Sequence, residues 1–454
     1  MSDLESNFLR EFFGALRDRQ VRYLVLRSSG QLPLSAGRGD LDVLVSPASK
    51  DDFFSVLREA VKNHQGAFVG CAESPGFCKA HFLLQSESNE WWGLCIDVFT
   101  FIPFRGRELF AWSALSPGLE CIDGIFFLNS YYGNLLGLIK ELLWNRRIDQ
   151  RYLDKAVALA AEGWEGMEDA FPLALLGESP GSFIQSVKHG ASSQSGQAVL
   201  ANELVRRANQ FMRKKGYWKG LGNSFRYQAS KLQRMLFPSG FFVAFLGVDG
   251  AGKSTLIDLV VPILDGVTHG GVHVRHLRPG LLPPLANLLG RSSSSGGEVT
   301  NPHGSRPSGR IGSVIRTLYY AADYFLGYWL IVRTLLARKP DVVIFDRFHF
   351  DLFLDPRRFR IGLSNRMLRP LVKLLPQPEL VICLVADPKA VHQRKPELPF
   401  REVCEQVSRL EMLAGSLSNA VVVKTDKSET ESRNEILIAM RDKLLERKSN
   451  GCDQ

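Results

Sequence analysis

The sequence predicts an α/β protein with two domains, one built on a parallel sheet and the other on a mixed sheet. From Phe241 onward, a strand, a glycine loop and a helix are followed by further strands with helical stretches between them, which is the order of a parallel α/β sheet. Residues 1–105 alternate short helical and strand patterns, as a smaller α+β domain does. A chain of 454 residues is also longer than one ordinary hydrophobic core requires.

Apolar spacing predicts the elements of the N-terminal domain. Helical spacing covers Leu4–Leu16 and Phe53–Val61. Short apolar runs predict strands at Tyr23–Leu26, Leu41–Val45, Phe68–Gly70, Ala80–Leu84 and Gly93–Phe101. We expect this domain over residues 1–127. A helical extension over 128–205 should follow, because NLLGLIKELLW repeats apolar residues three and four apart.

The C-terminal domain is expected over residues 241–447. Its first strand is the run FFVAF, and later strands are predicted at Val342–Phe345, Val381–Val385 and Ala420–Val423. The interval 290–310 is rich in Ser, Gly and Pro, which predicts a loop inside this domain.

Residues 206–240 are expected to connect the two domains, and they are strongly basic. Between Arg206 and Arg234 there are nine Lys or Arg residues and no Asp or Glu, with aromatic residues among them. We interpret this segment first as a solvated connector. The alternative is a surface that meets anionic lipid headgroups or a polyanionic substrate.

The composition is typical of a soluble globular protein, and we expect it in the cytoplasm. The N-terminus has acidic residues and no long apolar run, so a signal peptide is not expected. The run LYYAADYFLGYWLIV is too short to span a membrane and contains Asp323, so we predict a buried helix there. Seven cysteines without a CxxC pair predict reduced thiols. A peripheral position at the inner membrane surface is the alternative location.

The stretch GVDGAGKST has the spacing of a phosphate-binding loop between a predicted strand and a predicted helix. Glycines let the backbone wrap closely round phosphates, and the helix N-terminus points N–H groups at them. Lys253 would bring a positive charge to the β- and γ-phosphates, and the Ser254 hydroxyl would ligate Mg²⁺. The residues predicted to bind ATP are Gly247, Gly250, Ala251, Gly252, Lys253, Ser254 and Thr255.

Two downstream stretches favour a kinase over a motor or a switch. PDVVIFDRFHFD predicts a strand that ends at Asp346, where a carboxylate beside the loop can hold Mg²⁺. The adjacent Arg347 can reach the acceptor or the transferred phosphate. RKPEL places Arg394 where a mobile lid would exclude water, and the alternative for Arg394 is a solvated helix face.

In this order and spacing, GVDGAGKST, FDRFHFD and the lid arginine resemble the thymidylate kinase family over about residues 241–446. The resemblance implies that Asp249 contacts an acceptor sugar hydroxyl and that Arg347 positions the acceptor phosphate. The family element REPGGT is reduced here to LRPG, which contains Arg278 as a substrate-binding candidate. This departure puts thymidylate as the acceptor in doubt. DRFHFDLFLDPRRFR also resembles thymidylate-kinase-like proteins of bacterial surface-polysaccharide gene sets.

Three acids of the N-terminal domain form a second candidate site. In GDLDVLV, Asp40 and Asp42 alternate on a predicted strand and so point the same way. Asp97 lies in the middle of a later apolar strand, where an unpaired acid is costly. Converging carboxylates raise one another's pKa unless a cation neutralises them, and Mg²⁺ is the usual cation. We therefore predict a metal site at these three acids.

This arrangement resembles the polymerase-β-like nucleotidyltransferase superfamily over about residues 5–155. In that superfamily a Gly-Ser turn precedes the D-x-D strand, and a third Asp comes from a later strand. The turn is altered here to Arg27-Ser28-Ser29-Gly30, with Ser29 as the best counterpart.

Together these features predict an ATP- and Mg²⁺-dependent small-molecule kinase with a nucleotidyltransferase-like N-terminal domain. Its acceptor would be a nucleotide or a sugar (phosphate) rather than thymidylate. One alternative is nucleotidyl transfer to a sugar phosphate or glycan, with an auxiliary kinase domain. Another is an ATP-sensing scaffold at an anionic membrane surface. No nucleic-acid partner is expected, and a homodimer stays open.

Overall fold

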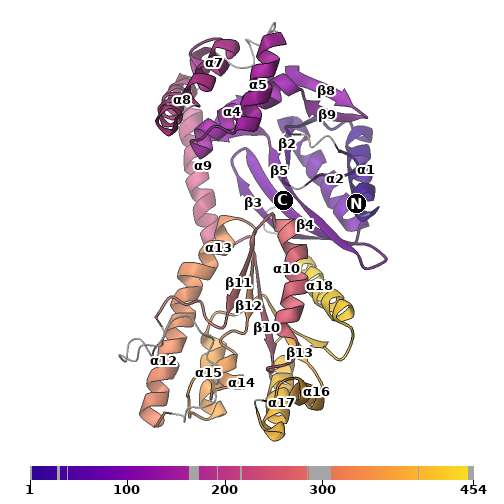
Figure 1. Cartoon of the computed structure of the whole chain (residues 1–454), viewed down its shortest axis with the longest axis vertical. Coiled ribbons are helices and arrows are strands. Elements are labelled where there is room, and N and C mark those ends of the chain that lie inside the picture. The colour runs from indigo at the N-terminus through magenta and orange to yellow at the C-terminus, as the bar shows by residue number, and fades with distance from the viewer. Residues whose placement is uncertain are drawn as a thin grey trace. The chain divides into compact units, whose positions relative to one another are not determined.

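The computed structural model divides into two compact units (Figure 1). The first comprises Met1–Gln65, Ala72–Ala80 and Leu94–Gln233, and the second comprises Gly66–Cys71, His81–Gly93 and Arg234–Gln454. The structure describes residues 3–27, 31–37, 39–162, 173–191, 193–214, 217–283, 285, 308–396 and 398–447. The predicted interval 290–310 therefore lies almost entirely outside the described residues.

The N-terminal part contains the predicted mixed sheet, which has seven strands in the order β3-β4-β5-β2-β1-β9-β8. Its strands are β1 (Tyr23–Val25), β2 (Leu41–Val45), β3 (Ala67–Ser74), β4 (Phe77–Gln85), β5 (Trp91–Phe99), β8 (Leu119–Ile122) and β9 (Ile125–Leu128). β2 runs antiparallel to β1 and parallel to β5. A separate antiparallel pair consists of β6 (Phe101–Phe104) and β7 (Arg107–Ala111).

Amphipathic helices complete this part of the chain. α1 buries Leu4, Phe8, Phe12 and Leu16, which recur at the four-residue spacing of one helical face. The helices and short helical turns are α1 (Asp3–Asp18), η1 (Pro47–Ser49), α2 (Lys50–Asn63), α3 (Trp112–Leu115), η2 (Ser116–Gly118), α4 (Ser130–Lys140), η3 (Glu141–Asn145), α5 (Gln150–Glu162), α6 (Leu173–Leu176), α7 (Pro180–Gly190), α8 (Gln194–Lys214) and α9 (Tyr217–Leu236). The segment predicted as a basic connector thus contains the end of α8 and all of α9.

The second unit is built on the predicted parallel sheet, with five strands in the order β11-β12-β10-β13-β14. The strands are β10 (Phe241–Gly247), β11 (Val272–His276), β12 (Val342–Asp346), β13 (Leu380–Val385) and β14 (Ala420–Lys424). β10 and β13 are buried along their whole length, which explains their continuous apolar runs. The predicted α/β fold class is confirmed.

Helices cover both faces of this sheet (Figure 1). On one face, α10 (Lys253–Thr268) and α18 (Glu429–Glu446) pack against the strands. On the other face lie α12 (Arg310–Gly327), η4 (Tyr328–Val332), α13 (Arg333–Arg338), α14 (Asp351–Leu354), α15 (Asn365–Leu374), α16 (Pro388–Arg394) and α17 (Phe400–Ser416). β10 is central in the sheet, so the loop that follows it has neighbouring strand ends on both sides.

The prediction of a buried helix at LYYAADYFLGYWLIV is only half right. Ala321 and Tyr324 of α12 pack into the core, whereas Leu318 is 60% exposed and Leu330 in η4 is 61% exposed. The reason is that only one side of the helix faces the sheet. Across the described part of the chain, no helix combines the length and apolar character needed to cross a membrane.

The prediction that all thiols are reduced is wrong for Cys71, which is disulfide-bonded. Spacing could not reveal this, because a disulfide depends on which thiols the fold brings together. The free thiols among the described residues are Cys78, Cys95, Cys121, Cys383 and Cys404.

Candidate active site and acid cluster

The loop between β10 and α10 has the backbone of a phosphate cradle. Gly250 and Gly252 have φ values of +90° and +85°, a region that side chains with a Cβ rarely adopt. A Cβ on Gly247 would lie 3.1 Å from the carbonyl oxygen of Leu384, so the loop also begins in close contact with β13. These glycines let the chain turn tightly into α10, whose N-terminal N–H groups suit an anion.

Lys253 is the first residue of α10, and its ammonium group is folded into the loop. Its Nζ donates hydrogen bonds to the carbonyl oxygens of Gly247 at 2.9 Å and Val248 at 3.0 Å. Burial, with the nearby charge of Arg347, lowers the pKa of Lys253 to about 7. A bound anion would favour the charged ammonium and raise this pKa. Ser254 and Thr255, the next residues of the helix, are exposed.

Asp249, inside the loop, is held by two arginines. Arg347 and Arg358 both donate hydrogen bonds to its carboxylate. Burial alone would raise the pKa of Asp249, but the charges of Arg347 and Lys253 outweigh burial and lower it to about 2. Arg347 also donates to Asp351 at 2.8 Å, and both of these side chains are buried. Two guanidinium groups are therefore fixed beside the phosphate loop.

Asp346 ends β12 directly beside the loop strand. It is the register partner of Phe245 in β10. His276 Nδ1 lies 3.2 Å from its Oδ2. The other oxygen, Oδ1, is buried and has no hydrogen-bond partner among the residues that the structure describes. Burial acts to raise the pKa of Asp346, but the hydrogen bond from His276 and the charge of Lys253 lower it overall. A buried, ionised oxygen without a donor fits a ligand of Mg²⁺.

The two remaining candidates are Arg278, predicted to bind substrate, and Arg394, predicted to belong to a lid or to a solvated helix face. Arg278 forms an ion pair with buried Asp323 at 3.3 Å, and its guanidinium lies over the ring of Tyr320 at 5.4 Å. Arg394 is exposed at the end of α16. The next residue, Lys395, lies against the loop instead, because a Cβ on Gly250 would be 3.3 Å from the Lys395 Cβ.

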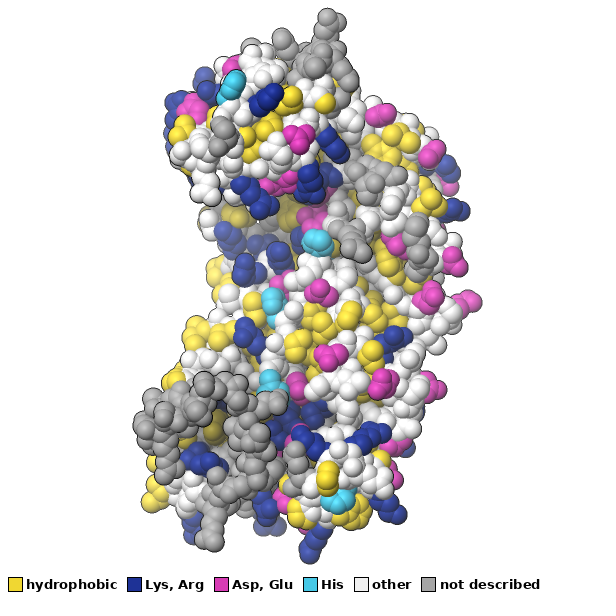
Figure 2. Space-filling view, viewed as in Figure 1, with side chains coloured by type: hydrophobic (Ala, Val, Ile, Leu, Met, Phe, Trp, Pro, Cys, Tyr) yellow, Lys and Arg dark blue, Asp and Glu magenta, His cyan; other side chains and the backbone are white. Residues whose placement is uncertain are grey.

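Sequence reasoning gave no role to four residues of this site. They are His276, Asp351, Arg358 and Lys395. Asp351 and Arg358 lie in DRFHFDLFLDPRRFR. The many charged residues of this stretch directly after a buried strand could have indicated that more of them belong to the site. Figure 2 shows Lys and Arg side chains with acidic side chains among them on the visible face of this unit.

The three N-terminal acids do come together. Asp42 in β2 and Asp97 in β5 are register partners on adjacent parallel strands. The prediction that Asp40 is part of the strand is wrong by one residue, because β2 begins at Leu41, after the bend at Gly39. The altered turn at 28–30, including Ser29, lies outside the described residues.

Basic side chains contact each of these acids. Arg27 hydrogen-bonds to Asp42, and Lys140 Nζ lies 3.9 Å from the same carboxylate. Lys79 Nζ lies 2.9 Å from Asp40 Oδ2 and 2.8 Å from Asp97 Oδ1. Burial nevertheless raises the pKa of Asp97 to about 6, with Lys79 opposing this shift. The predicted metal at these acids stays a prediction.

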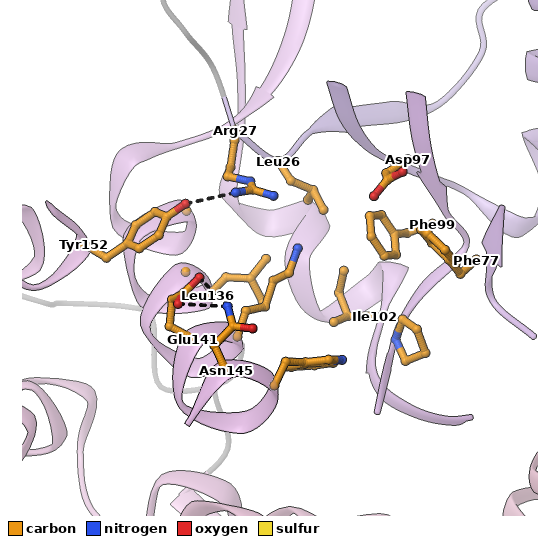
Figure 3. Close-up of a pocket in the computed structure, with 15 residues that line it drawn as sticks. Leu26, Arg27, Phe77, Asp97, Phe99, Ile102, Leu136, Glu141, Asn145 and Tyr152 are labelled. Atoms are coloured by element: carbon orange, nitrogen blue, oxygen red, sulfur yellow. Dashed lines mark hydrogen bonds between the residues drawn. The ribbon is translucent and has the colours of Figure 1, made fainter. Parts of the chain in front are cut away.

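A cavity of about 420 Å³ lies beside Asp97 in the first unit. In Figure 3, Asp97 and Phe99 line it from β5, and Glu141, Asn145 and Tyr152 line it from the helical segments. Its basic lining residues are Arg27 and Lys140. Its flat apolar side chains are Phe77, Phe99 and Trp144. The cavity therefore combines apolar surface with side chains of both charges, two basic and two acidic.

No protein-family model and no curated protein match this sequence. Among solved structures, thymidylate kinase from Ehrlichia chaffeensis aligns with a TM-score of 0.30 and 18% identity, over 44% of this chain and 98% of that chain. Thymidylate kinase from Candida albicans aligns with a TM-score of 0.34 and 16% identity, over 45% of this chain and 93% of that chain.

Proposed function

We propose that the chain is an ATP- and Mg²⁺-dependent kinase of small molecules. The observation that carries the proposal is a pair of hydrogen bonds. Arg347 and Arg358 both donate to the carboxylate of Asp249, a residue of the phosphate loop itself. Hydrolysis requires a water molecule, whereas transfer requires a second substrate held next to the γ-phosphate. An acid and two guanidinium groups at the loop are suitable groups for holding such a substrate.

In this proposal, some residues of the site stabilise charge and others position the substrates. The Lys253 ammonium would exchange its two carbonyl acceptors for phosphate oxygens and balance the charge that develops during transfer. Ser254 and Asp346 would hold Mg²⁺, which when bound helps to neutralise the transferred phosphoryl group. Arg347 would orient the acceptor, and its bond to Asp351 fixes its direction.

The acceptor is proposed to be a nucleotide or a sugar (phosphate) other than thymidylate. Arg347 and Arg358 present planar forks of donors, which suit phosphate and hydroxyl oxygens. Arg278, the remnant of the thymidylate kinase element, has its charge paired with buried Asp323. Using Arg278 for an acceptor phosphate would leave that carboxylate without its counter-charge, with the Leu282 N–H as its remaining donor at 2.7 Å.

The test is an acceptor screen with γ-labelled ATP over nucleoside monophosphates, sugars and sugar phosphates. We expect label in one of these acceptors, weaker labelling of thymidylate, and loss of labelling in Asp346→Asn. ATP hydrolysis that no acceptor stimulates would contradict a kinase. A clear preference for thymidylate would contradict the proposed acceptor class.

A peripheral contact with anionic lipid is a separate proposal for α9. Phe225 is 77% exposed and Leu232 is 63% exposed on this helix, with the basic residues Arg226 and Lys231 also exposed. Apolar and basic side chains together suit a membrane surface. Co-sedimentation with vesicles that contain phosphatidylserine, compared with neutral vesicles, tests it, and a Phe225→Ser/Leu232→Ser variant should bind less.

A further inference from the structure

The ammonium group of Lys79 lies at the centre of the acid cluster in the first unit. Its Nζ is 2.9 Å from Asp40 Oδ2, 2.8 Å from Asp97 Oδ1 and 3.1 Å from Cys95 Sγ. These three residues are also the group whose ligand atoms, all within 4.8 Å of one another, could hold a metal ion. Lys79 therefore contacts the same atoms that a metal would contact.

We propose that Lys79 is the resident cation of this cluster and that the cluster does not take up a divalent metal. A metal ion binds carboxylate oxygens at about 2.0–2.6 Å. It would have to displace the ammonium group, because both cations need the same oxygens of Asp40 and Asp97.

The position of Lys79 in the sheet supports this role. Lys79 belongs to β4, which lies between β3 and β5 in the sheet, so its backbone is held on both sides. Its side chain is only 12% exposed. If the ammonium group left, two partly buried carboxylates would lose their counter-charge, which is a costly state in a protein interior.

The remaining acid of the cluster also has protein cations. Asp42 is hydrogen-bonded to Arg27, and Lys140 lies 3.9 Å away. The three carboxylates are thus matched by three basic side chains, and the cluster is close to neutral when all six are charged. A divalent ion would add two positive charges to a cluster that already has its counter-charges. The sequence had suggested a metal because it does not reveal these neighbours.

The inference does not depend on the proposed kinase activity, because it concerns the acid cluster of the first unit. Mn²⁺ without nucleotide is the probe. Mn²⁺ binding to the nucleotide-free full-length protein can be counted by electron paramagnetic resonance. Every protein in the series carries Asp346→Asn, which removes the carboxylate among the two candidate metal ligands of the second unit, Ser254 and Asp346. In this background we expect no bound Mn²⁺ ion that is lost on Asp97→Asn.

Adding Lys79→Met should create a Mn²⁺ site. Changes in the surroundings of a metal alter its affinity about 10- to 100-fold, so we expect binding at least about tenfold tighter. A further Asp97→Asn change should abolish this gain. Lys50→Met is the matched control, because Lys50 pairs with Glu73 at 2.8 Å in the same unit and does not touch the cluster. It should leave Mn²⁺ binding unchanged.

Two results would overturn the proposal. The first is a Mn²⁺ ion bound while Lys79 is present and lost on Asp97→Asn. The second is a Lys79→Met protein that is folded by circular dichroism and gains no Mn²⁺. If Lys79→Met does not fold, the test uses two proteins that keep Lys79, one with Asp97 and one with Asp97→Asn. Equal Mn²⁺ binding by these two proteins supports the proposal, and a loss of Mn²⁺ on Asp97→Asn contradicts it.

Discussion

The ammonium group of Lys253 donates a hydrogen bond to the carbonyl oxygen of Gly247 at 2.9 Å, across the turn that joins β10 to α10. The group is buried and depends on the loop's own carbonyls for its partners. A bound polyphosphate would offer stronger acceptors in the same loop. The bond therefore places the charge where a phosphate is expected.

Lys253→Ala should abolish phosphoryl transfer and leave the fold intact. The loss of one charge-stabilising group of this kind costs about 10²–10³ in rate. Steady-state transfer from γ-labelled ATP to the acceptor found in the screen measures the effect. Lys443→Ala is the control, because Lys443 lies on α18 and pairs with Glu446 at 2.8 Å. Normal turnover by folded Lys253→Ala would argue against the kinase proposal.

Gly250→Ala should weaken ATP binding. Alanine is strained at a φ of +90°, and its Cβ would press on Val391 and Lys395 at 3.3 Å. Gly266→Ala in α10 is a matched control, because its Cβ would meet nothing within 4 Å and alanine favours a helix by up to about 1 kcal/mol. Calorimetric titration with ATP should show the loss for Gly250→Ala only. Equal affinities would mean that the loop does not need this conformation.

Arg358→Ala should raise the KM for the acceptor and leave the KM for ATP unchanged. A hydrogen bond to a charged group contributes about 1.5–3 kcal/mol, which corresponds to roughly 10- to 100-fold. The exposed Arg401, which pairs with Glu405 on α17, offers Arg401→Ala as a control. If the KM values for both substrates rose together, Arg358 would support the loop rather than the acceptor.

His349 should make the second unit sensitive to acid. It is fully buried, and its Nε2 lies 3.0 Å from the carbonyl oxygen of Pro376, which can only accept, so Nε2 donates this hydrogen bond. Burial lowers the pKa of His349 to about 3, from 6.5 in the unfolded chain. The unfolded state therefore binds more protons between these values, and stability is present above pH 6.5 and falls as the pH drops towards 3.

At pH 5 this linkage should reduce the free energy of unfolding by about 2 kcal/mol relative to pH 7. Urea unfolding at the two pH values measures the difference. His349→Gln keeps an N–H donor for Pro376 but does not titrate, so it should remove that part of the pH dependence. An unchanged pH dependence in a folded His349→Gln protein would show that other groups cause it.

The phosphate-loop part of the candidate site could be predicted because its residues follow one another in the sequence. The loop residues from Gly247 to Thr255 are contiguous, so strand, loop and helix signals lie side by side. Asp346 was predictable for a related reason, because the carboxyl ends of parallel strands meet at one edge of the sheet. Apolar runs identified most of the buried strands of both sheets. The pair β6 and β7 and the hairpin of β8 and β9 were not predicted, because runs of only four or five residues are too short to separate a strand from a loop or a buried helix turn by apolar pattern.

The tertiary structure alone decided which charges meet. Arg358 reaches Asp249 across 109 positions of sequence, and nothing in DPRRFR distinguishes it from its neighbour Arg357. Lys79 is one lysine in the strand FCKAHF, and only the order β4-β5-β2 brings it to Asp40 and Asp97. Electrostatic energy depends on distance through space and on burial, neither of which linear order records. The sequence therefore determined where the acids lie, and the fold determined which cations neutralise them.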